Sequence, residues 1–119
     1  MPVLADLRVG TETAMADAVT RSRLGDGRVL GWYGEPGVVL DAEIADSTPP
    51  AALAARYGAD RFWERWTAAE CGAKATGVPM HLWLREHGLS PGSASDAVVV
   101  ETLTLDDLVV SIGRPRPAL

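Results

Sequence analysis

The stretch RFWERWTAAECGAKATG, residues 61–77, decides the fold of this chain. Its apolar residues recur every three or four positions, at Phe62, Trp66, Ala69 and Ala73. That spacing is typical of the buried face of an amphipathic helix, and a glycine such as Gly77 is a common helix stop. We therefore expect a long helix over residues 59–77 whose apolar face packs against the rest of the protein.

A neighbouring stripe of the same helix carries Trp63, Thr67, Glu70 and Lys74. Lys74 is the only lysine in a chain with ten arginines. A Glu followed by a Lys four positions later forms a surface pair that stabilises a helix by roughly 0.3–0.5 kcal/mol. The alternative is that Lys74 is needed for its compact, titratable ammonium group, which arginine cannot supply.

Outward from this helix, short apolar and β-branched stretches predict strands. They lie at residues 3–9, 28–34, 38–44 and 97–113, the last being two strands joined at Asp106 and Asp107. The sequence EPG at 35–37 is typical of a type II turn. We therefore expect residues 28–44 to form a β-hairpin.

Other periodic segments predict helices that end at a basic residue or a glycine. They cover residues 11–23, with Thr11 as N-cap, 51–58 and 78–88, and a loop follows at 89–96. This pattern predicts an α+β fold, with an antiparallel sheet and helices packed on one side of it. We expect one domain over residues 1–113 and a tail over 114–119.

Composition excludes several classes of protein. The formal net charge is −5, whereas nucleic-acid binders usually carry a basic surplus. The single cysteine, Cys71, excludes an internal disulfide. No signal-peptide pattern or membrane-length apolar run is present. We expect a soluble cytoplasmic protein that binds neither nucleic acid nor membranes.

Two acidic residues in the stretch LDAEI stand two positions apart, at Asp41 and Glu43. Residues at that spacing in a strand point to the same face. Two adjacent carboxylates repel each other unless a cation lies between them, and a hard divalent cation prefers oxygen ligands. The plainer alternative is a solvated strand face.

The order of these features resembles that of the 4′-phosphopantetheinyl transferase superfamily. Members have an apolar strand ending in Asp-x-Glu, then a helix reading Trp-x-x-Lys-Glu-x-x-x-Lys and a glycine. In this chain the two motifs are VVLDAEI and RFWERWTAAECGAKATG, and the resemblance covers roughly residues 20–113. It implies an enzyme that transfers 4′-phosphopantetheine from coenzyme A to a serine of an acyl or peptidyl carrier protein.

The resemblance also implies roles for particular residues. Asp41, Glu43 and Glu70 match the carboxylates that hold Mg²⁺ on the pyrophosphate of coenzyme A. Glu70, directly or through a metal-bound water, would also help to deprotonate the acceptor serine. Lys74 would stabilise or protonate the departing bisphosphorylated adenosine, because a compact ammonium group suits phosphate.

Three departures from the family pattern stand out. Ala69 replaces a lysine, and Arg23 replaces a histidine that accompanies a serine, here Ser22, in contacts with coenzyme A. Arg21 and Arg23 remain candidates for its 3′-phosphate; alternatively they end a helix, where cations are favoured. The segment 44–69 is shorter than in the family, where it contributes to carrier-protein docking.

Two alternatives to the transferase follow from these departures. One is a degenerate relative that binds coenzyme A or a carrier protein without transfer. The other is an enzyme repurposed to act on a carrier-bound intermediate. In the family, the coenzyme A cleft lies between two copies of one α+β unit, so the resemblance implies a homo-oligomer, either a dimer or a trimer. Arg61 and Arg65 could meet an acidic carrier protein.

Overall fold

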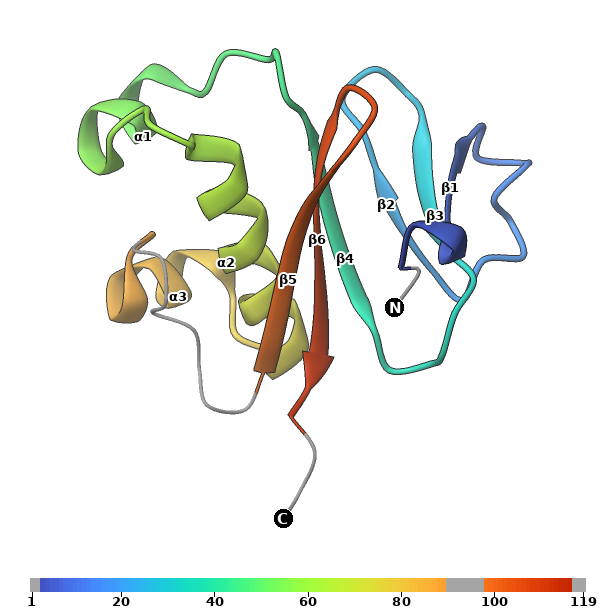
Figure 1. Ribbon diagram of the computed structural model, residues 1–119. Helices are drawn as coiled ribbons and strands as arrows, with labels where there is room; N and C mark the ends of the chain where they lie inside the picture. Colours follow the sequence, from blue (N-terminus) through green and yellow to red (C-terminus); the bar gives the residue numbers. More distant parts are fainter. Residues whose placement is uncertain (1–2, 90–97, 117–119) are drawn as a thin grey trace.

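The computed structural model describes residues 3–89 and 98–116 of the chain (Figure 1). A short 3₁₀ helix at Val3–Asp6 precedes the strands β1 (Leu7–Gly10), β2 (Thr20–Arg23), β3 (Val29–Trp32) and β4 (Val39–Ile44). Three helices follow, namely α1 (Ala51–Tyr57), α2 (Phe62–Thr76) and α3 (Met80–His87). The strands β5 (Val98–Leu105) and β6 (Leu108–Pro115) complete the described chain. The predicted α+β class is confirmed.

The strands form two antiparallel sheets rather than the single sheet expected. The N-terminal sheet has the order β1-β3-β2, and the C-terminal sheet has the order β4-β6-β5. The apolar core between them includes Leu30 and Trp32 of β3, Leu40 of β4, and Val110 and Ile112 of β6, each exposed by 2 % or less. The helices lie on the other side of the C-terminal sheet (Figure 1). The molecule is therefore layered as sheet, sheet and helices.

The expected hairpin over residues 28–44 is wrong. Strand β3 is the centre of the N-terminal sheet and pairs with β1 and β2 on its two edges. Both edges are therefore occupied, and β4 pairs instead with β6, from Leu40↔Ile112 to Ile44↔Leu108. The EPG segment thus carries the chain from β3 of the N-terminal sheet to β4 of the C-terminal sheet, and Leu30 of β3 and Leu40 of β4 belong to the same core.

The expected helix over residues 11–23 is also wrong, although its N-cap signal is real. The Thr11 hydroxyl accepts a hydrogen bond from the Ala14 N–H at 3.0 Å, and the Met15 N–H donates to the Thr11 carbonyl at 3.0 Å. The chain makes turns over residues 12–17 and then enters β2. Pairing with β3 overrides the local helical preference, because it satisfies the backbone of residues 20–23 within a sheet.

The remaining element predictions hold more closely. The three helices expected after residue 50 are present, and a two-residue turn at Asp106–Asp107 joins β5 and β6. The first strand is shorter than expected, because residues 3–6 form the 3₁₀ helix. Strand β6 continues to Pro115, two residues beyond the predicted end of the last strand. The loop predicted at 89–96 lies almost wholly outside the described residues.

Helix α2 is buried on two sides. The predicted stripe of Phe62, Ala69 and Ala73 joins a second apolar cluster with Trp83 of α3 and Leu89, while Trp66 packs at its edge. The opposite side of α2 contacts β4, β5 and β6. Gly72 is required where α3 crosses, because a Cβ there would lie 2.4 Å from the Trp83 ring. Packing against α3 on one side and the sheet on the other therefore fixes the position of α2, and with it the polar side chains that α2 directs toward the sheet.

Candidate functional site

Strand β4 separates its apolar and acidic residues onto opposite faces. Leu40 and Ala42 enter the core between the two sheets. Asp41 and Glu43 therefore point to the other face, beneath α2, as the two-residue spacing predicts. Asp41 is aligned with Ser111 of β6, and Glu43 with Val109. The solvated strand face is excluded for Asp41, since this residue is only 9 % exposed.

Hydrogen bonds fix α2 on this face of the sheet. The Thr67 and Ser111 hydroxyls are 2.8 Å apart, and Ser111 bonds in turn to the Thr102 hydroxyl of β5 at 2.7 Å. The Cys71 thiol donates to the Ser111 carbonyl at 3.2 Å. Trp63 Nε1 donates to the Ser47 carbonyl at 2.8 Å, just beyond the end of β4. Because these bonds hold the helix, Glu70 and Lys74 have a defined position over β4.

Lys74 bonds to the strand rather than to the glutamate on its own helix. Its Nζ donates to the Leu40 carbonyl at 2.9 Å and to Asp41 Oδ1 at 3.2 Å. Within the described ranges, Glu70 has no basic partner at ion-pair distance. The helix-surface pair of Glu70 and Lys74, weighed as the plainer interpretation, is therefore not formed. Lys74 neutralises a carboxylate that is distant in sequence.

The four residues form one electrostatically coupled group. Burial raises the pKa of Asp41 to about 7, Lys74 opposes that rise, and the negative charges of Glu70 and Glu43 add to it. The pKa of Glu43 is also raised, first by its partial burial and then by Glu70. The structure thus brings together Asp41, Glu43, Glu70 and Lys74 from β4 and α2. When all three carboxylates are ionised, negative charge exceeds positive charge among them by two.

Among residues 3–89 and 98–116, one oxygen of Asp41 has no hydrogen-bond partner. Oδ1 accepts a hydrogen bond from the Lys74 ammonium group, whereas the buried Oδ2 accepts none from these residues. A buried carboxylate oxygen without a donor is costly, and such atoms in native proteins are few. The oxygen without a donor and the excess negative charge both indicate that a further cation would be attracted to this site.

The donor chemistry of this group fits Mg²⁺, which prefers carboxylate oxygens and retained water. Across residues 3–89 and 98–116, however, no three His, Cys, Asp or Glu side chains lie close enough together to hold a metal ion. The donors predicted for Mg²⁺ are therefore gathered around one site but not assembled into a ligand set.

Cys71, beside Glu70 in the sequence, is a buried structural residue. It is fully buried, and burial is the largest of the effects that raise the pKa of its thiol to about 12. A thiol with that pKa stays protonated near neutral pH and is a poor nucleophile. It contributes to the site by anchoring α2 to β6.

The arginines predicted for coenzyme A lie elsewhere. Ser22 is buried and pairs with the core residue Leu30, so its neighbours Arg21 and Arg23 point to the outer face of the N-terminal sheet. Both pair with Glu12, Arg23 through two hydrogen bonds of 2.9 and 2.7 Å. The alternative that they end a helix is wrong, because they lie in β2. Within one chain, the C-terminal sheet separates them from Asp41.

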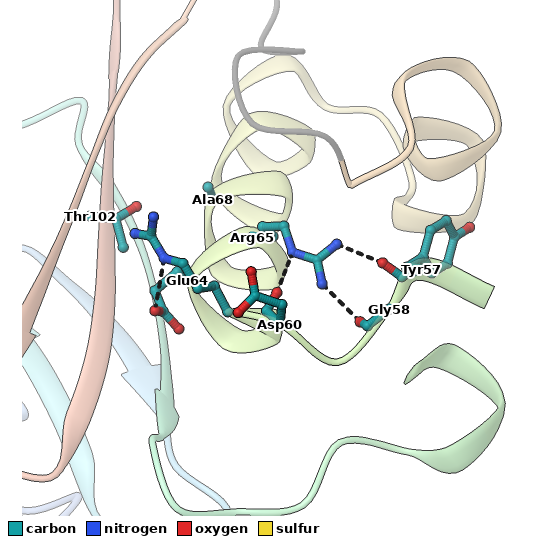
Figure 2. A pocket seen from close by; sticks show the side chains of 8 residues that line it. Tyr57, Gly58, Asp60, Glu64, Arg65, Ala68 and Thr102 are labelled. Carbon is teal, nitrogen blue, oxygen red and sulfur yellow. Dashed lines mark hydrogen bonds and ion pairs between the residues drawn. The ribbon is translucent and has the colours of Figure 1, made fainter. Parts of the chain in front are cut away.

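A pocket of about 540 Å³ opens on the other side of α2, near β5 (Figure 2). It is lined by Tyr57, Gly58, Asp60, Arg61, Glu64, Arg65, Ala68 and Thr102. The Arg65 guanidinium donates to the carbonyls of Tyr57, Gly58 and Asp60 at 2.8–2.9 Å. Arg61 pairs with Glu64 at 3.3 Å. Arg65 is thus occupied in closing the end of α1, which the sequence pattern did not indicate.

Sequence reasoning also missed the polar contacts that connect the layers. Arg28, just before β3, donates to Asp107 in the β5–β6 turn at 2.8 and 3.1 Å and to Asp26 at 2.8 Å. Thr67, Ser111 and Thr102 form a hydroxyl chain from α2 to β5. No motif signals such contacts, because each joins residues from separate elements.

A scan against models of known protein families finds no match to this chain, and a search of curated protein sequences finds none either. In the described part of the chain, no helix is both long enough and apolar enough to cross a membrane.

Proposed function

We propose that this protein transfers 4′-phosphopantetheine from coenzyme A to a serine of an acyl or peptidyl carrier protein, with Mg²⁺ as cofactor. The observation that carries the proposal is the charge-coupled group of Asp41, Glu43, Glu70 and Lys74. These are the four positions that match the family motifs, and residues 44–69 separate the first two from the last two.

Asp41, Glu43 and Glu70 are the residues that would hold Mg²⁺. The orphaned Oδ2 of Asp41 supports this assignment, because a buried carboxylate oxygen with no donor is a natural cation ligand. When bound, the ion would offset the negative charge of the coenzyme A pyrophosphate. Burial and the negative charge of Glu70 raise the pKa values of both Asp41 and Glu43, and a bound cation would offset both effects.

Glu70 and Lys74 would act on the reacting groups. The Glu70 carboxylate, half-buried and without a basic partner among residues 3–89 and 98–116, accepts the proton of the attacking serine hydroxyl. The serine oxygen bonds to the phosphorus next to pantetheine, and the bond from that phosphorus to the bridging oxygen breaks. The bisphosphorylated adenosine leaves with the electron pair, and the ammonium group of Lys74 stabilises its new negative charge.

Arg21, Ser22 and Arg23 are not part of the proposed catalytic group. All three lie in β2 of the N-terminal sheet, and Glu12 already neutralises the two arginines in part. A homo-oligomer, in which a second copy borders the coenzyme A cleft, remains part of the proposal, as does a cytoplasmic location. Docking of the carrier through Arg61 and Arg65 gains no support, because Arg65 is bonded to three backbone carbonyls.

One observation favours a second function, namely binding of coenzyme A or a carrier protein without transfer. The carboxylates are not assembled into a metal-holding group, and Lys74 already occupies one oxygen of Asp41. If that arrangement persisted with substrate present, the chain would retain a phosphate-binding lysine but lack the metal needed for reaction.

Intact-protein mass spectrometry of an apo carrier protein separates the two functions. The carrier is incubated with coenzyme A, Mg²⁺ and this protein, beside the Glu70→Gln and Lys74→Ala variants. Transfer predicts a gain equal to the mass of phosphopantetheine that is lost in Glu70→Gln. Absence of the gain with several carriers, while coenzyme A still binds, would establish the binding function instead.

A further inference from the structure

Lys74 holds a particular position relative to Asp41. Its side chain is 42 % exposed, whereas the Asp41 side chain is 12 % exposed. The ammonium group thus lies between a buried carboxylate and solvent. Its bond to the Leu40 carbonyl, at 2.9 Å, is slightly shorter than its bond to Asp41 Oδ1, at 3.2 Å, and is made to backbone that the sheet holds in place. Lys74 closes the exposed side of the acidic site.

The charges around Lys74 indicate that a stronger cation can displace its ammonium group from Asp41. One ammonium group lies in a cluster with three carboxylates, and it reaches only Oδ1 of Asp41, so that the buried Oδ2 is left without a donor. A divalent cation brings twice the charge to the same carboxylates. Near a partly buried site, where charges are poorly screened, that cation and the ammonium group would repel each other strongly on a shared carboxylate.

We propose that Lys74 is the resident cation of this acidic site: its ammonium group neutralises Asp41 in the metal-free protein and leaves Asp41 when a divalent cation binds. This inference rests on the metal-binding part of the proposed function. Because the Lys74 side chain is half exposed, it can swing outward by rotating its own side-chain bonds while α2 remains on the sheet.

The exchange has a consequence for substrate binding. While Lys74 is bonded to Asp41 and Leu40, two of the three N–H donors of its ammonium group are occupied. Release by the divalent cation makes those donors available for a phosphate oxygen outside the strand. The divalent cation therefore precedes the phosphate-bearing substrate, and the same lysine serves first the protein and then the ligand.

Because the chain contains one lysine, nuclear magnetic resonance of its side chain tests the exchange directly. In protein labelled with ¹³C-lysine, the ε-methylene group of Lys74 gives one set of signals. We expect these signals to move on addition of Mg²⁺ alone, toward their positions in metal-free Asp41→Asn, which lacks the carboxylate partner. Binding of Mg²⁺ to the same samples is followed by calorimetry.

The affinity for the metal gives a second measurement. Lys74→Met removes the competing cation, so we expect Mg²⁺ to bind about tenfold more tightly than to the unaltered chain. Arg8→Met is the matched control. It removes one positive charge from the outer face of the N-terminal sheet, where Arg8 stacks on Tyr33, and should change the affinity by less than about twofold, since distant exposed charges are screened.

The possible results distinguish the exchange at Lys74 from the metal binding on which it depends. Moving lysine signals together with tighter binding to Lys74→Met support the exchange. Binding of Mg²⁺ with unmoved lysine signals, or with equal affinity for Lys74→Met, overturns the exchange and leaves the metal site intact. Absence of Mg²⁺ binding to every variant overturns both the exchange and the metal-binding part of the proposed function.

Discussion

Two strands of this protein carry a pair of like charges around one small residue, but the two pairs lie in different environments. On β4, Asp41 and Glu43 flank Ala42; on β2, Arg21 and Arg23 flank Ser22. Both central residues are buried, so both charged pairs point away from the interior between the sheets. Asp41 and Glu43 meet α2, whereas Arg21 and Arg23 are exposed and meet a glutamate.

The difference shows that charge pattern alone does not define a site. The arginines are partly neutralised by Glu12, and exposed ion pairs of this kind contribute little to stability. Asp41 is instead buried with an orphan oxygen and only partial compensation from Lys74. An arrangement that costs folding free energy while retaining a strong charge is a common mark of a functional site.

Transfer activity gives the largest expected contrast between the two pairs. We expect Asp41→Asn to lower the rate of phosphopantetheine transfer by about a hundredfold or more, because both charge stabilisation and cation binding depend on this carboxylate. Arg21→Ala with Arg23→Ala should lower it by no more than a few fold, given the intervening sheet. Initial rates measured by carrier-protein mass spectrometry check this prediction. An equal loss would indicate that a second copy brings the arginines to the site.

Stability should change in the opposite direction to activity at Asp41. Asp41→Leu replaces a buried, partly compensated carboxylate with an apolar side chain, while the ammonium group of Lys74, whose side chain is 42 % exposed, stays accessible to water. Removing the desolvation cost of the carboxylate should therefore stabilise the protein by about 1–2 kcal/mol. We expect a higher free energy of unfolding in urea at pH 8 without metal. Arg21→Leu on β2 should leave it unchanged within error. A destabilised Asp41→Leu protein would show that the Asp41–Lys74 pair contributes more than the burial costs.

The pH dependence of stability should also distinguish the two pairs. The pKa of Asp41 is raised from 3.8 to about 7 in the folded chain, so the folded state holds this proton more tightly than the unfolded state does. The resulting stability is fully present below about pH 4 and is lost as the pH rises through 7. In the presence of a metal chelator, Asp41→Asn should reduce the change in the free energy of unfolding between pH 4 and pH 8. An unchanged slope in this variant would assign the titration to another group.

The smallest effect is expected at the arginine pair. The pKa of Glu12 is lowered, mainly by its hydrogen bond to Arg23, but both groups are fully exposed. Glu12→Gln should therefore leave the thermal midpoint unchanged within error in 0.5 M salt, with a drop only at low ionic strength. A drop of several degrees that persists at high salt would mean that Glu12 organises the 12–17 turns as well as the arginines.

Sequence reasoning succeeded where local pattern and tertiary contact agree. The helices after residue 50 and the β5–β6 hairpin followed from periodicity and residue type. It failed over residues 11–23 and 28–44. There, a capped helical turn and a Pro-Gly turn were correctly recognised as local features. Local pattern did not reveal that β2 and β3 pair with each other, or that β4 pairs with β6 near the other end of the chain.

The sequence by itself determined that Asp41 and Glu43 share a strand face and that Glu70 and Lys74 share a helix stripe, because strand and helix periods are local geometry. Only the tertiary structure decided that Lys74 bonds to Asp41 and not to Glu70. It also decided that the β2 arginines lie across a sheet from the carboxylates. The physical reason is that ion pairing and burial depend on distances between elements, which the pairing of β4 with β6 and the packing of α2 set together.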